Sequence, residues 1–111
     1  MEISFADEAL RAVCNTEREL KKAYGKQRAK LMRRRLDDLD AVDNLAHMRQ
    51  LPGRCHELKG NHAGQLSLDL DGPYRLIFRP NHDPLPTKLD GGLDWTRVTA
   101  ITVLGVEDTH E

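Results

Sequence analysis

The sequence predicts an α+β fold, in which two N-terminal helices pack on one face of a mainly antiparallel, twisted sheet in the order β-α-α-β-β-β. Three observations carry this prediction. Apolar residues recur with helical spacing between residues 6 and 42, the period falls to two after residue 54, and a turn sequence at residues 71–73 separates two alternating segments. A length of 111 residues suits one domain, so we expect residues 1–111 to form a single unit.

The first half of the chain is predicted to form a short strand and then helices. Residues 1–5 alternate as a strand does, and an apolar helical stripe follows from residue 6 to residue 24. The capping box Thr16–Glu19 leaves two alternatives, one long helix or two short helices with a break at Asn15. The second predicted helix spans about residues 26–42, and its core-facing residues are Ala29, Met32, Leu36 and Leu39.

The second half predicts a β-hairpin whose register follows from its apolar pattern. A two-residue turn would place Leu68 opposite Arg75 and mix apolar with charged side chains. A three-residue loop at residues 71–73 makes one face apolar throughout, so we predict that loop. The resulting pairs are Leu70 with Tyr74, Leu68 with Leu76, Leu66 with Phe78 and Asp69 with Arg75.

Three further segments complete the predicted sheet. Residues 55–58 are expected to form a strand, and residues 81–94, rich in Pro, Gly and Asp, a long surface loop. Residues 96–106 are β-branched and apolar, which predicts a central strand.

Composition and charge restrict the class of protein. With 39% hydrophobic and 32% charged residues, the chain fits a globular protein, and no apolar run is long enough to span a bilayer. The N-terminus lacks a secretory pattern, which predicts a cytoplasmic location. Cys14 and Cys55 are expected to be free thiols. The spacing of Cys and His residues matches no zinc pattern, so neither a metal nor a cofactor is expected.

Basic residues are concentrated in one stretch although the net charge is −1. Residues 18–35 hold nine Lys and Arg against one acid, Glu19, and residues 37–43 hold four Asp. Such a stretch can bind phosphate, or it can be a solvated helix face whose charges are balanced locally; the pattern leaves both alternatives open.

Three sequence motifs together resemble a known family. They are Cys55–Gly60 (C-H-E-L-K-G), Gly64–Leu68 (G-Q-L-S-L) and Tyr74–Arg79 (Y-R-L-I-F-R), and the chain ends close after Asp108-Thr109-His110. This combination resembles the HigB-type branch of the RelE/ParE toxins. The resemblance implies the toxin of a type II toxin–antitoxin system that cuts mRNA on the 70S ribosome. It also implies a HigA-like helix-turn-helix antitoxin as partner, with operator DNA bound only through the complex.

The resemblance also implies a site. Its catalytic positions fall on His56, Asp108 and His110, with Arg75 as a basic catalytic partner and Lys59 as a phosphate contact. Apart from the resemblance, phosphate contacts are also expected from Arg79 and, in the basic stretch, from Arg33 and Arg34. Metal-free RNA cleavage uses the 2′-hydroxyl as nucleophile, so it needs a base, an acid and cations around the phosphate. Histidine suits both proton transfers because its ordinary pKa is about 6.5. Arg75 has a second interpretation, an ion pair with Asp69 across the hairpin.

Two departures from the family pattern keep other functions open. Thr109 stands where the family has Tyr, and Leu66 stands where an aromatic residue is common. The alternatives are a protein-binding toxin without catalysis, like the gyrase-poisoning ParE branch, and an inactive homologue that binds an antitoxin.

Overall fold

The structure, a computed structural model, describes residues 1–108. Its main elements in chain order are β1 (Glu2–Phe5), α1 (Glu8–Cys14), α2 (Glu17–Tyr24), α3 (Lys26–Ala41), β2 (His56–Glu57), β3 (Leu66–Asp69), β4 (Tyr74–Pro80) and β5 (Ala100–Asp108). Three short 3₁₀ turns, η1 (Leu45–Gln50), η2 (Gly60–His62) and η3 (Trp95–Arg97), lie between them. No helix in residues 1–108 is long and apolar enough to cross a membrane.

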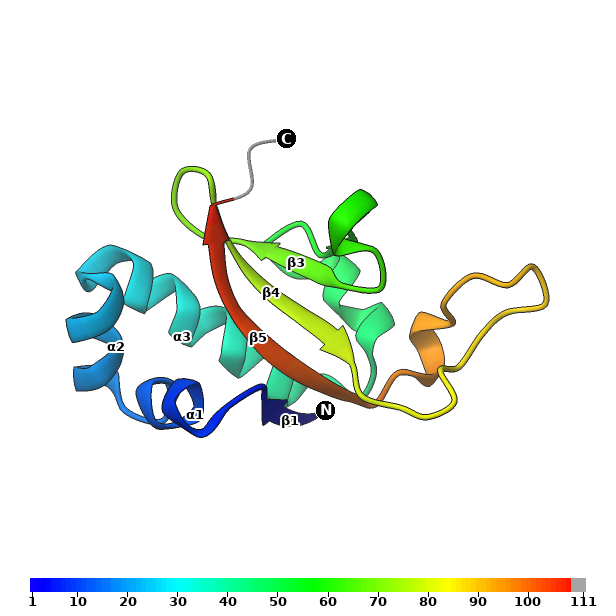
Figure 1. The fold of residues 1–111 in the computed structure, drawn as a ribbon, viewed down its shortest axis with the longest axis horizontal. Coiled ribbons are helices and arrows are strands. Elements are labelled where there is room, and N and C mark those ends of the chain that lie inside the picture. The colour runs from blue at the N-terminus through cyan, green and yellow to red at the C-terminus, as the bar shows by residue number, and fades with distance from the viewer. Residues whose placement is uncertain (109–111) are drawn as a thin grey trace.

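The strands form one five-stranded sheet in the order β1-β5-β4-β3-β2. β1 runs parallel to β5, and all other neighbouring strands are antiparallel. The helices lie together on one side of this sheet, and residues 81–94 project from the opposite end of the molecule as a long loop (Figure 1). The predicted α+β class, with helices on a mainly antiparallel sheet, is confirmed.

The N-terminal helical stripe forms two helices, the second of the two predicted alternatives. The Thr16 side-chain oxygen accepts a hydrogen bond from the backbone N–H of Glu19 at 3.2 Å, which caps the start of α2. Asn15 ends α1, its N–H donating to the carbonyl of Arg11. The first backbone N–H groups of a helix lack partners within that helix, and an N-cap side chain supplies one. A capping residue at Thr16 therefore favours the start of a new helix there over one continuous helix.

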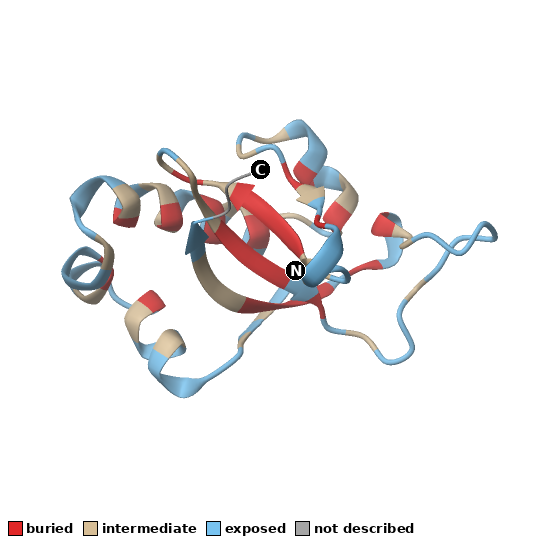
Figure 2. Ribbon diagram, turned by 45° about the horizontal axis from the view of Figure 1, so that its top comes forward, coloured by how far each residue is buried: buried red, intermediate tan, exposed pale blue. Residues whose placement is uncertain are grey.

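The predicted hairpin register is confirmed. Leu66 pairs with Phe78, Leu68 with Leu76 and Asp69 with Arg75, and the Leu70 N–H donates to the Tyr74 carbonyl at 2.9 Å. The register places alternate residues in the core, and the central strands are accordingly buried (Figure 2).

The predicted bounds of the last strand were wrong at its start. β5 begins at Ala100 rather than at residue 96. The Asp94 carboxylate accepts hydrogen bonds from the Thr96 N–H at 3.1 Å and from the Arg97 side chain at 2.9 Å, which holds Trp95–Arg97 in a 3₁₀ turn. A local side-chain cap therefore prevails over the β-propensity of these residues.

A β-bulge bends β5 where the register with β4 shifts between Ile77 and Phe78. Ile77 faces Gly105 and Phe78 faces Val103, so Leu104 is the extra residue. Gly105 has a φ of 146°, which favours glycine because a Cβ atom is strained there.

The two faces of the sheet differ in character. On the inner face, Leu66, Leu68, Leu76 and Phe78 join Met32 and Leu36 of α3 in the core. The alternate residues of β3 and β4 point to the outer face, where Ser67, Asp69, Arg75, Ile77 and Arg79 lie. Their register partners on neighbouring strands are His56, Gly105 and Glu107.

Candidate functional site

A tight turn at residues 52–54 attaches β2 to the edge of the sheet. The carbonyl of Gly53 accepts the Asp69 N–H at 2.7 Å, and the Arg35 Nε donates to the Asp69 carbonyl at 2.9 Å. Gly53 has a φ of 113°, and a Cβ atom there would lie 2.9 Å from the Arg35 Nε. The buried Arg35 therefore packs against a position that accepts only glycine, and this contact sets where His56 begins its strand.

The hydrogen bonding of His56 defines its tautomer. Its Nδ1 lies 2.8 Å from the carbonyl oxygen of Arg54. A carbonyl can only accept, so Nδ1 carries a proton, and in the neutral form of the ring the remaining nitrogen, Nε2, is the acceptor. Arg54 has a φ of 50°, a conformation that non-glycine residues rarely adopt, and this backbone turns its carbonyl toward the ring.

Among residues 1–108, three buried polar atoms on the outer face have no hydrogen-bond partner. They are the His56 Nε2, the Ser67 Oγ and the Arg75 Nε. His56 pairs with Ser67, and Ser67 pairs with Ile77 on the next strand. Arg75 lies two residues before Ile77 on that strand, so its side chain points to the same face. Buried polar atoms are nearly always paired, so these three atoms are available to a ligand. The histidine nitrogen can accept a hydrogen bond when the ring is neutral, and the hydroxyl and the arginine nitrogen can donate one.

Asp69 holds two arginines on the same face. Its Oδ1 is paired with the Arg75 Nη1, and its Oδ2 accepts from the Arg54 Nε at 3.0 Å. The Arg75 side chain is only 13% exposed, against 60% for Arg54. The alternative interpretation of Arg75 as a partner of Asp69 is therefore confirmed in the geometry, although its Nε remains unpaired.

A hollow of about 550 Å³ brings His56 and Lys59 together. Its lining is completed by Arg54, Glu57 and Gly60. The Glu57 carboxylate accepts the indole N–H of the buried Trp95 at 3.1 Å, an interaction that anchors the end of the long loop. Cationic side chains therefore outnumber acids around the hollow, which suits an anionic ligand.

His62 and Glu107 form a contact that the sequence did not indicate. The His62 Nε2 lies 2.6 Å from the Glu107 Oε2, and their side chains are 37% and 49% exposed. The partners are 45 residues apart, in η2 and β5. Its only signal in the sequence was a histidine close after the L-K-G motif, and nothing local pointed to Glu107.

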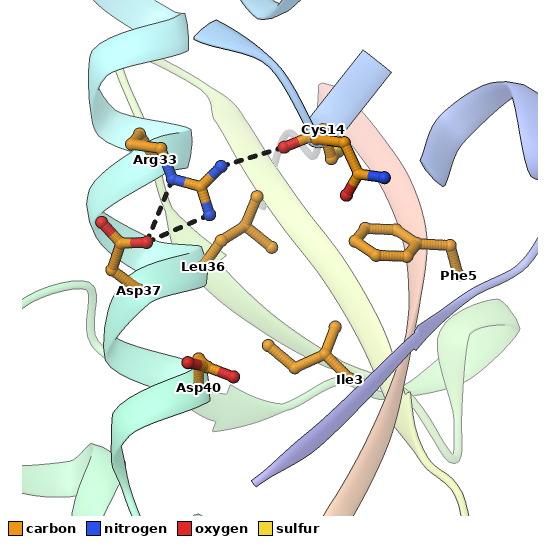
Figure 3. Close-up of a pocket in the computed structure, with 8 residues that line it drawn as sticks. Ile3, Phe5, Cys14, Arg33, Leu36, Asp37 and Asp40 are labelled. Atoms are coloured by element: carbon orange, nitrogen blue, oxygen red, sulfur yellow. Dashed lines mark hydrogen bonds and ion pairs between the residues drawn. The ribbon is translucent and has the colours of Figure 1, made fainter. Parts of the chain in front are cut away.

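Other predicted site residues lie elsewhere. Arg33 belongs to α3 on the helix side of the sheet, where its Nη1 donates to the Cys14 carbonyl at 2.9 Å and its Nη2 pairs with Asp37 at 3.1 Å (Figure 3). Arg34 is an exposed residue of the same helix, so neither is brought to His56. Arg79 is exposed on the outer face opposite Thr102, and Asp108 ends β5 opposite Tyr74. His110 and Thr109 lie outside the described residues.

The two cysteines are poor nucleophiles. Burial raises the pKa of the Cys14 thiol, with the Arg33 charge acting in the other direction. Burial also raises the pKa of Cys55 to about 12. Both thiols are free and protonated at neutral pH, which excludes thiolate catalysis by either residue. Within residues 1–108, no three His, Cys, Asp or Glu side chains gather as metal ligands.

The arrangement of this sheet and its helix layer is a fold found in solved toxin structures. Over its whole length, the chain matches the YoeB–YefM complex from Staphylococcus aureus with a TM-score of 0.57 and 15% identity, covering 98% of that chain. It matches the YoeB/ParE toxin from Agrobacterium tumefaciens with a TM-score of 0.53 and 12% identity, over 99% of this chain and 100% of that one. No family model and no curated protein sequence matches. The fold is therefore shared although little of the sequence is.

Proposed function

We propose that this chain is the toxin of a type II toxin–antitoxin system and that it cuts mRNA on the ribosome. The observation that carries the proposal is His56. Its neutral tautomer, fixed by the Arg54 carbonyl, presents Nε2 as an acceptor beside a hollow lined by Arg54 and Lys59. The toxin fold of the YoeB and ParE structures supports the same class of function.

The proposed reaction is metal-free transesterification. The His56 Nε2 takes the proton of the 2′-hydroxyl, whose oxygen then forms a bond to phosphorus. The bond from phosphorus to the 5′-oxygen breaks, and an acid protonates that oxygen, leaving a 2′,3′-cyclic phosphate. Arg75 and Lys59, together with Arg79, are proposed to stabilise the charge on the phosphoryl oxygens. The proposed set of catalytic positions also includes Asp108 and His110.

Burial of the reactive nitrogen supports dependence on the ribosome. The His56 Nε2 is buried, so a 2′-hydroxyl reaches it only after the side chains around it move. Binding in the decoding site can supply the free energy for that movement, whereas free RNA does not. We therefore expect translated mRNA to be cut and naked RNA to be left intact.

The proposed partners follow from the same class. One structural neighbour is YoeB in a complex with YefM, which supports an antitoxin partner for this chain. We propose a HigA-like helix-turn-helix antitoxin in the cytoplasm, with operator DNA bound only through the toxin–antitoxin complex.

A protein-binding toxin without catalysis is the second candidate. The ion pair between Arg75 and Asp69 favours this candidate, because Asp69 neutralises part of the Arg75 charge that would otherwise bind a substrate phosphate. The projecting loop also carries two exposed apolar side chains, Leu85 at 46% and a fully exposed Leu89. Exposed apolar side chains on a loop suit a protein partner better than RNA.

Induced expression in bacteria without any antitoxin separates these candidates. Wild type is compared with the His56→Ala/His110→Ala double variant, with mapping of mRNA 5′ ends and a check that both proteins fold. The nuclease predicts growth arrest and new ends inside translated frames for wild type alone. Arrest by both proteins without new ends would favour the protein-binding toxin, and no arrest by wild type would favour an inactive homologue.

A further inference from the structure

The loop between β2 and β3 folds back across the outer face. This loop enters β3 at Leu66, whose neighbours across the sheet are Phe78 and Val103. Glu107 lies four residues further along β5, yet His62 of the loop reaches it at 2.6 Å. The contact therefore brings a second histidine to the outer face, which also holds His56.

Glu107 fixes the orientation of the His62 ring. An ionised carboxylate only accepts hydrogen bonds, so the His62 Nε2 carries a proton and donates it. The other nitrogen, Nδ1, has no hydrogen-bond partner within residues 1–108. When the ring is protonated, Nδ1 carries the second proton, which it can donate to a neighbouring oxygen.

The two histidines have environments suited to opposite roles. His56 faces a carbonyl, and its free nitrogen is an acceptor, as a base requires. His62 faces a carboxylate and is 37% exposed, so solvent can return its proton after each reaction cycle. Two titratable groups held in contrasting environments are the usual arrangement of an acid–base pair. Arg75 lies between Asp69 and Glu107 in the sheet, beside the carboxylate that holds His62.

We propose that His62, oriented by Glu107, is the general acid of the site. The inference rests on the proposed nuclease function and assigns its second proton transfer. While the His56 Nε2 accepts the proton of the 2′-hydroxyl, the His62 Nδ1 donates its proton to the departing 5′-oxygen. His62 regains a proton from solvent, and the reaction needs no further co-reactant. In this assignment His110 is not the acid.

The test separates proton transfer from mere attachment of the loop. A glutamine at position 62 can still donate its amide N–H to Glu107, but it cannot transfer a proton. Cleavage of mRNA translated on purified ribosomes is measured with wild type, His62→Gln and His47→Gln between about pH 5.5 and about pH 9, a range that spans the ordinary histidine pKa of about 6.5. General acid–base groups contribute roughly 100- to 10,000-fold.

We expect His62→Gln to lose at least about 100-fold in rate. We also expect it to lose the fall in rate at high pH, which reports deprotonation of the acid. His47→Gln, at an exposed histidine of η1 that does not line the hollow, is the control and is expected to stay near the wild-type rate. If His62→Gln cuts at the wild-type rate with an unchanged pH profile, His62 only holds the loop and the inference is wrong.

Two further variants test the orientation of the ring by Glu107 and the proton transfer by His62. Glu107→Ala removes the acceptor that orients the His62 ring, so we expect a loss in rate in the same direction as in His62→Gln. In His62→Ala, added imidazole is expected to restore part of the rate; no restoration in a folded variant would count against proton transfer. If wild-type protein cuts no mRNA on ribosomes, the proposed nuclease function fails, and this assignment is overturned with it.

Discussion

The inner and outer faces of the same two strands follow different rules. Leu66, Leu68, Leu76 and Phe78 on the inner face are fully or almost fully buried against the helices. On the outer face, the equally buried Ser67 hydroxyl and one nitrogen of Arg75 have no hydrogen-bond partner within the part of the chain that the structure describes. The inner face is built for packing, whereas the outer face keeps polar atoms unsatisfied at a cost to stability. Such a cost is typical of functional sites.

The largest expected effect is at the inner face. Replacing Leu68, which is 0% exposed, by alanine removes packed apolar atoms and leaves a cavity. We expect the free energy of unfolding to fall by about 2–5 kcal/mol, measured from urea denaturation at pH 7. A loss below about 1 kcal/mol would mean that the inner face is less tightly packed than its burial indicates.

The adjacent outer residue is expected to respond in the opposite direction. Ser67→Ala removes a buried hydroxyl that has no partner, so no hydrogen bond is lost and a desolvation cost is relieved. We expect stability to rise by about 1 kcal/mol, measured by the same urea titration. A clear loss of stability would show that Ser67 forms a hydrogen bond in solution, for which the His56 Nε2 is the nearest register partner.

These two neighbours also illustrate what the sequence could predict. The period of two between Leu66 and Phe78 was enough to predict the hairpin register and every inner-face pair. The same period placed Ser67, Asp69 and Arg75 together on the other face, but it carried no information about what lies above them. Register follows from local alternation, and for that reason it was predictable.

The site itself depends on contacts between distant parts of the chain. The His62–Glu107 pair joins residues 45 positions apart, and the turn at Gly53 depends on Arg35 from α3. Motif resemblance pointed to His56, Lys59 and Arg75, whereas the basic stretch of the sequence suggested Arg33 and Arg34. Those two lie on the helix side because α3 uses its apolar stripe to pack against the inner face. The basic stretch of the sequence therefore did not identify residues of the outer face of the sheet.

The smallest expected effect concerns the ion pair that joins the helix layer to the hairpin. Arg28 of α3 donates to both carboxylate oxygens of Asp71, at 2.9 and 3.2 Å, while its guanidinium lies 3.5 Å from the centre of the Tyr74 ring. The hydrogen bonds from Arg28 hold the pKa of Asp71 below its usual value.

A group whose pKa is lower in the folded state stabilises the protein above its unfolded pKa, about 3.9 for Asp, and this contribution is lost as pH falls through the folded value. Asp71→Asn is therefore expected to cost up to about 1 kcal/mol at pH 7, because the pair is only partly buried, and to cost progressively less below about pH 4. The measurement is urea denaturation of both proteins between pH 7 and pH 3. Asp83→Asn is the control, since Asp83 is exposed and has no ion pair in residues 1–108. If the difference for Asp71→Asn stays constant as pH falls, the charge of Asp71 contributes nothing to the attachment, and the helix layer holds the hairpin by packing alone.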